Sequence, residues 1–194
     1  MRREASALLG LGLLFSAASS ASAQEAIHVE PVRDYVEARV RPWIADPLII
    51  GALKDQNDLH AHLTQNAVSD LDAQWRLEFG RTHRPLIESV LSNPLSQFLR
   101  DKQAQSDGVI TEIFVIDAKG LTVGESETTS DYWQGDEAKW QQTFLVGAGV
   151  LFIDKGEKDE STQMLQSQAS MTISDPRTGQ PIGSITVGIN LDAL

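Results

Sequence analysis

A short aromatic and charged segment carries the residues best suited to holding a ligand. Six of its side chains are candidates for a ligand site: Asp131, Tyr132, Trp133, Asp136, Lys139 and Trp140. Aromatic rings offer a large contact area and attract cations, and nearby carboxylates add negative charge, so the segment could hold an amine. Lys139 and Arg76 could instead pair with a carboxylate. The sequence leaves these two ligand chemistries open.

The same segment has a purely structural interpretation. Trp133 and Trp140 could plug one face of a sheet, while Asp131 and Asp136 cap a short helix. Trp75 follows the apolar stripe of a predicted helix and is expected in the core. A long connection in a compact domain is usually functional or disordered, and the aromatic residues argue against disorder. We therefore expect Asp131, Tyr132 and Trp133 to contact a ligand. Either Lys139 or Trp140 is expected to close the pocket.

Catalytic and metal-binding patterns are weak in this sequence. It has no cysteine, which excludes disulfides, cysteine nucleophiles and cysteine–zinc sites. His60 and His62 could form a metal pair on an extended segment, but in a helix or loop a solvated surface position is favoured. The acidic run 154–160 lacks the ligand pattern of a calcium loop and is interpreted as a charged turn. We expect no enzyme activity, no metal and no cofactor.

The elements that must position the candidate segment change character near residue 108. Before it, apolar residues recur with helical spacing. Pro31 suits the first turn of a helix over 32–44. Ser69 and Asp72 indicate a capping box at the start of a later helix.

After residue 108 the apolar residues alternate with polar ones. Five strands are expected, at Val109–Ile116, Leu121–Ser126, within Gln142–Ile153, at Leu165–Ile173 and at Gly183–Ile189. Short turns imply an antiparallel sheet, and helices followed by strands imply an α+β fold. The link 127–141 is expected to place a loop with a short helix over one sheet face. A polar row faces either a pocket under that link or water: Gln166, Gln168, Ser170 and Thr172.

The N-terminus predicts export. A basic start, a short apolar run and an Ala-x-Ala site give a cleavable signal peptide over 1–23, followed by one domain over 24–194 with a helical part to 107. The net charge of −11 makes nucleic acid an improbable partner. We expect a periplasmic protein.

Several segments together resemble the Cache-type, PAS-like extracytoplasmic sensor domain. They are Asp55-Gln56-Asn57, Leu71–Arg76, Ile110–Asp117, Thr129–Glu137 and Gly183–Leu194. The resemblance implies a PAS-like five-stranded antiparallel sheet with an insertion after the second strand. Such domains usually lie between two membrane helices of a kinase, cyclase or chemoreceptor. Because this chain stops at Leu194, it is expected to be free-standing.

Two functions follow from this resemblance. The first is a periplasmic domain that binds or senses a small molecule without catalysis and acts with a separate membrane receptor or kinase. The alternative is a protein–protein interaction module that docks on a receptor or kinase and has no small-molecule ligand. A homodimer is expected to form through the N-terminal helix, whose apolar face carries Val32, Tyr35, Val36 and Val40.

Overall fold

The computed structural model describes residues 19–158 and 165–194, and the predicted signal peptide lies largely outside these ranges. Helices come first: α1 (Ser19–Tyr35), a π-helical turn η1 (Val36–Val40), a 3₁₀ turn η2 (Arg41–Trp43), α2 (Pro47–His60), α3 (Gln65–Glu78), α4 (Pro85–Leu91) and α5 (Pro94–Ala104). Strands follow, with one short helix among them: β1 (Ile110–Asp117), β2 (Thr122–Glu125), α6 (Ala138–Gln141), β3 (Leu151–Ile153), β4 (Glu157–Lys158), β5 (Leu165–Ser174) and β6 (Pro181–Asn190).

The strands form one antiparallel sheet in the order β2-β1-β6-β5-β3, and β4 pairs with β5 beside this path. The α+β fold class, with helices first and an insertion after the second strand, is confirmed. The short strand β4 falls within the acidic run interpreted as a turn, so that interpretation is wrong at 157–158. Residues 159 and 160 lie outside the described ranges.

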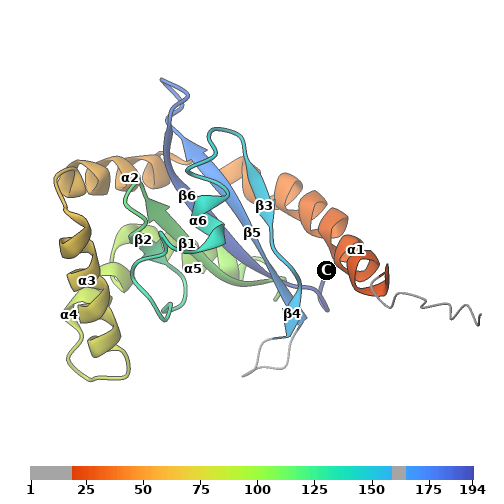
Figure 1. Ribbon diagram of the computed structural model, residues 1–194, viewed down its shortest axis with the longest axis horizontal. Coiled ribbons are helices and arrows are strands. Elements are labelled where there is room, and N and C mark those ends of the chain that lie inside the picture. Colours follow the sequence, from red (N-terminus) through yellow and green to blue (C-terminus); the bar gives the residue numbers. More distant parts are fainter. Residues whose placement is uncertain (1–18, 159–164) are drawn as a thin grey trace, which may run out of the picture.

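One face of the sheet packs against α1, η1, α2 and α5. Alternate residues of β1, β5 and β6 supply its apolar side chains: Ile113, Val115, Ala169, Met171, Ile173, Ile185, Val187 and Ile189. Helix α6 lies in front of the strands and helix α5 lies behind them, so these two helices cover opposite faces of the sheet (Figure 1). The described chain has no helix that is both long and apolar enough to cross a membrane.

The start of the helical part differs from the prediction in two places. Pro31 lies inside α1, because that helix already begins at Ser19. Helix α3 begins at Gln65, where the Thr64 hydroxyl accepts the Ala67 N–H. The predicted capping box at Ser69 and Asp72 is therefore wrong, and the Asp72 carboxylate has another use.

The apolar face on which the dimer prediction rested is covered within the chain. Val32, Val36 and Val40 are fully buried in the core under the sheet. Tyr35 is partly buried at the edge of that core. These valines leave no apolar stripe for a second copy, so the prediction loses its structural basis.

Candidate functional site

The insertion between β2 and β3 begins with a segment, here called the first arm (residues 129–133), that docks on α3. The Asp72 carboxylate accepts the backbone N–H groups of Tyr132 and Trp133, each at 3.0 Å. The Tyr132 ring stacks on Trp75 with centroids 5.1 Å apart, and the Trp75 indole N–H donates to the Thr129 carbonyl. Tyr132 and Trp75 are buried, so this arm is held by both packing and charge.

Asp131 lies at the edge of this contact rather than within it. Its carboxylate is 2.9 Å from an Arg76 guanidinium nitrogen, and Arg76 also pairs with Asp72. The Asp131 side chain is 28% exposed and that of Arg76 is 59% exposed. An ion pair in such surroundings contributes little to stability.

The rest of the insertion up to the end of α6, here called the second arm (residues 134–141), crosses the sheet face that α6 covers. The indole N–H of Trp133 donates to the Lys119 carbonyl, and that of Trp140 donates to the Asp117 carbonyl. Both tryptophans are thus fixed to the turn between β1 and β2. Helix α6 begins after Glu137, which makes no capping hydrogen bond through its side chain. The suggestion that Asp131 or Asp136 caps this helix is wrong.

A cavity of about 600 Å³ opens between α6 and the outer strands. Lys139 and Glu137 line it from the α6 side, while Phe152, Gln166 and Gln168 line it from the sheet. Its volume lies within the range of small-molecule pockets. The Lys139 ammonium is held 5.3 Å from the centre of the Phe114 ring, so a cation faces the sheet at this place.

On the sheet face beneath α6, strands β5 and β6 carry polar side chains, in contrast to the opposite face. The residues of β5 and β6 that alternate with the apolar core positions are Gln168, Ser170, Thr172, Ser184 and Thr186. The Ser170 and Thr186 hydroxyls are 2.9 Å apart and hydrogen-bonded. Thr172 and Ser184 are register partners, and their hydroxyls have no hydrogen-bond partner among the described residues. The polar row of β5 therefore splits, since Gln166 and Gln168 line the cavity and Ser170 and Thr172 are buried.

Glu125 adds a buried acid to this polar face. It lies opposite Phe114 in the β1–β2 register and is fully buried. One carboxylate oxygen accepts the N–H and the hydroxyl of Thr129. Burial raises the pKa of Glu125 to about 7, although the Thr129 hydrogen bonds oppose the rise. The group can therefore lose or gain a proton near neutral pH.

Lys139 alone of the six predicted site residues lines the cavity within the described part of the chain. Asp131, Tyr132 and Trp133 belong to the arm on α3, Asp136 is exposed, and Trp140 holds the hairpin turn. Ligand contact by these five residues stays a prediction.

Sequence reasoning missed Glu137, Phe152 and Glu125 as parts of this region. The alternation in β5 had signalled Gln166 and Gln168 without deciding which way they face. Phe152 and Glu125 gave no comparable signal, because a three-residue and a four-residue strand are too short to show a period.

The histidine at the end of α2 has a structural partner. His60 is 8% exposed, and its Nδ1 lies 2.8 Å from an Asp117 carboxylate oxygen. Asp117 is fully buried and also accepts Gln56 Nε2 and the Lys119 and Leu121 N–H groups. The solvated interpretation is therefore wrong for His60, because the last turn of α2 faces the hairpin turn. The described residues contain no group of three or more histidines or acids placed to hold a metal ion.

Comparisons with solved structures give similarities of arrangement at low identity. A sensor domain of the histidine kinase DctB from V. cholerae is 14% identical with a TM-score of 0.48, over 89% of this chain and 54% of that one. The ligand-binding domain of the Pseudomonas aeruginosa chemoreceptor PctC, solved with GABA, is 12% identical with a TM-score of 0.39, over 87% of this chain and 58% of that one. The sensory domain of the Campylobacter jejuni chemoreceptor Tlp3 is 17% identical with a TM-score of 0.41, over 77% of this chain and 64% of that one.

All three are sensor or ligand-binding domains of signalling proteins. They are of the class that the sequence resembles. The chain spans less than two thirds of the length of each. The sequence matches no family profile and no curated protein. At these identities and TM-scores, the similarity assigns no ligand, partner or activity to this chain.

Proposed function

We propose that this protein is a periplasmic sensing domain that binds a small organic molecule between α6 and the sheet, without catalysis. The observation that carries the proposal is the cavity of about 600 Å³, with Lys139 on one wall and amide side chains on the other. The Thr172 and Ser184 hydroxyls on the same sheet face, which have no hydrogen-bond partner within the described ranges, add polar groups beneath the insertion. A free-standing chain would pass its signal to a separate membrane receptor or kinase.

The charges around the cavity favour a zwitterion. On the α6 wall Lys139 supplies a cation and Glu137 an anion. A ligand with both an ammonium and a carboxylate group can pair with both kinds of side chain, whereas a simple amine or acid would leave like charges opposite it. We therefore propose a small amino acid or related zwitterion, which joins the amine and the carboxylate that the sequence had left open.

The experiment is a thermal-shift screen of free amino acids, followed by calorimetry on each compound that raises the melting temperature. A ligand that binds only the folded state raises the protein's free energy of unfolding by about 2.7 kcal/mol when the ligand concentration is one hundred times its dissociation constant. Lys139→Gln should weaken binding about tenfold or more, because a charge-assisted contact is lost. Arg81→Gln serves as the control, since it removes one exposed positive charge in the turn between α3 and α4.

Two results would overturn the proposal. The first is a screen in which no zwitterion raises the melting temperature, which would favour the interaction module with no small-molecule ligand. The second is an identified ligand whose affinity falls equally in Lys139→Gln and Arg81→Gln, because the cavity under α6 would then not be its site.

A further inference from the structure

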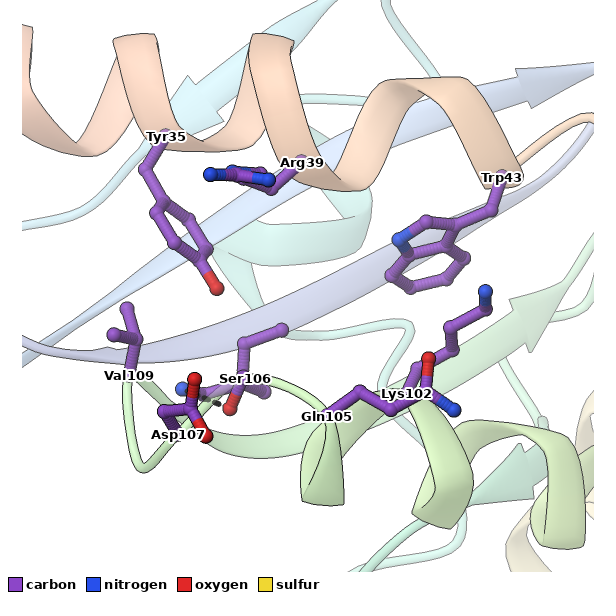
Figure 2. Close-up of a pocket in the computed structure, with 9 residues that line it drawn as sticks. Tyr35, Arg39, Trp43, Lys102, Gln105, Ser106, Asp107 and Val109 are labelled. Atoms are coloured by element: carbon purple, nitrogen blue, oxygen red, sulfur yellow. Dashed lines mark hydrogen bonds between the residues drawn. The ribbon is translucent and has the colours of Figure 1, made fainter.

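A second groove lies on the helical side of the sheet, away from α6. It has a volume of about 430 Å³ and lies between the helical segment 35–43 and the end of α5 with the start of β1. Figure 2 shows Tyr35 and Trp43 at its two ends, Arg39 between them, and Lys102 beside Trp43. Asp107 and Ser106 form the floor below Tyr35 (Figure 2).

The helix that forms one wall has an irregularity where the groove lies. The buried residues Val32, Val36, Val40 and Ile44 follow each other at intervals of four. In a regular α-helix each interval of four turns about 40° beyond a full turn, so such a row would rotate off the sheet. The wider π turn η1 (Val36–Val40) corrects this rotation. The preceding row of Tyr35, Arg39 and Trp43 is thereby kept along the groove. Single π turns are frequent at functional sites.

The groove concentrates positive charge in an acidic protein. The chain has a net charge of −11, yet the groove contains Arg39 and Lys102 against one acid, Asp107. Neither cation forms a salt bridge with any residue of the described ranges. Arg33 and Arg41 of the same helical segment, in contrast, pair with Glu30 and Glu37.

Aromatic side chains give the groove an apolar body beside these charges. The Lys102 ammonium lies 5.9 Å from the centre of the Trp43 ring and 5.2 Å from that of Phe98. These contacts fix the ammonium position without neutralising it. At the other end, burial raises the pKa of the Tyr35 phenol while Arg39 lowers it, so the neutral hydroxyl remains available as a donor.

We infer that this groove is a second binding site, for a small organic acid that joins one carboxylate to a flat apolar body. The Arg39 guanidinium, between the two ends of the groove, donates to the carboxylate, and the Lys102 ammonium beside Trp43 adds a second positive charge in the groove. The apolar body lies against Trp43, and Asp107 at the Tyr35 end repels any second negative charge. This site is distinct from the cavity under α6 and does not depend on the function proposed there.

The test compares phenylacetate with phenylacetamide, which has the same shape and no charge. Each is titrated at constant ionic strength into the ¹⁵N-labelled full chain, with the Trp43 indole N–H signal assigned by its loss in Trp43→Phe. Phenylacetate should move this signal saturably, and phenylacetamide should bind at least tenfold more weakly. Arg39→Gln and Lys102→Gln should each weaken phenylacetate about tenfold. Arg81→Gln and Lys139→Gln should bind it like the wild type.

Three results would overturn the inference. Equal binding of the acid and the amide would show that the two cations do not select a carboxylate. Equal losses in Arg39→Gln and Arg81→Gln would reduce the effect to general charge. A shift of the Trp43 signal that never saturates, or a saturable response that Lys139→Gln abolishes, would place phenylacetate elsewhere. Since Arg39 is exposed and Lys102 only partly buried, the variants should fold, and the ratio of acid to amide affinity is independent of stability.

Discussion

Replacing Asp72 with alanine should release the first arm of the insertion from α3. The side chain is 12% exposed and accepts two backbone N–H groups, those of Tyr132 and Trp133, each at 3.0 Å. A hydrogen bond to a charged group contributes about 1.5–3 kcal/mol, and a buried N–H left without a partner costs a further penalty. Taking the lower end for each bond, Asp72→Ala should reduce the free energy of unfolding by about 3 kcal/mol.

The matching change at Asp131 separates this anchor from a general effect of charge. Asp131→Ala removes an acid that pairs with the same Arg76, but in a more exposed position than Asp72, so about 0–1 kcal/mol should be lost. Both variants are measured by urea denaturation, followed by circular dichroism and by tryptophan fluorescence. For a domain of this size the loss in Asp72→Ala corresponds to a fall in melting temperature of about 6–12 °C.

Asp72→Asn tests the role of the charge itself. Its amide oxygen can still accept a hydrogen bond, so its loss of stability should lie between those of Asp72→Ala and the wild type. If Asp72→Ala loses no more stability than Asp131→Ala, the arm is held by the stack of Tyr132 on Trp75. The reasoning from the carboxylate would then be refuted.

Two further predictions concern the same region. Burial raises the pKa of Glu125 from 4.5 to about 7. Between these two pH values the folded state keeps a proton that the unfolded state has lost. The stability contributed by this group is therefore full below pH 4.5 and falls as the pH rises through 7. Glu125→Gln should therefore match the wild type in urea denaturation near pH 4.5 and exceed it by about 2–3 kcal/mol at pH 8, whereas parallel stability curves from pH 4.5 to 8 would contradict this. Gly120→Ala should lose at least about 2 kcal/mol, because φ is +84° and the new Cβ would lie 2.7 Å from the Gly135 Cα. Gly179→Ala has φ of +73° and no atom within 4 Å, so it should show only the conformational cost of about 1 kcal/mol in the same thermal melts, and equal losses would argue against the close approach at Gly120.

The strands were more predictable than the helical part. In β5 and β6 one face is apolar and the other polar, so the alternation of Ala169, Met171 and Ile173 with Ser170 and Thr172 reveals the core face directly. The start of α3 was misplaced because Asp72 has a residue type suited to a cap, while its carboxylate binds backbone sixty residues away. Sequence spacing cannot reveal such a distant partner.

The candidate site shows the same limit. The insertion was located correctly along the chain, but its residues divide between α3, the hairpin turn and the cavity. Trp133 and Trp140 have the same chemistry as ligand-binding tryptophans, and both indole N–H groups are instead used by the carbonyls of Lys119 and Asp117. His60 was misjudged because its partner Asp117 lies 57 residues further along the chain. These assignments depend on which turn lies next to which helix, and that is a property of the tertiary structure.

The position of β6 governs how this fold can form. β6 is synthesised after every other strand of the sheet, yet it lies between β1 and β5 and pairs with both. Its contact with β1 joins residues that are more than sixty positions apart, such as Asp117 and Gly183. Contacts of such high sequence separation slow folding, because the chain must close a long loop before they form. A ribosome-bound chain that has not yet released β6 would leave β1 and β5 with unpaired edges, so the sheet assembles only after the strand at its centre has been made.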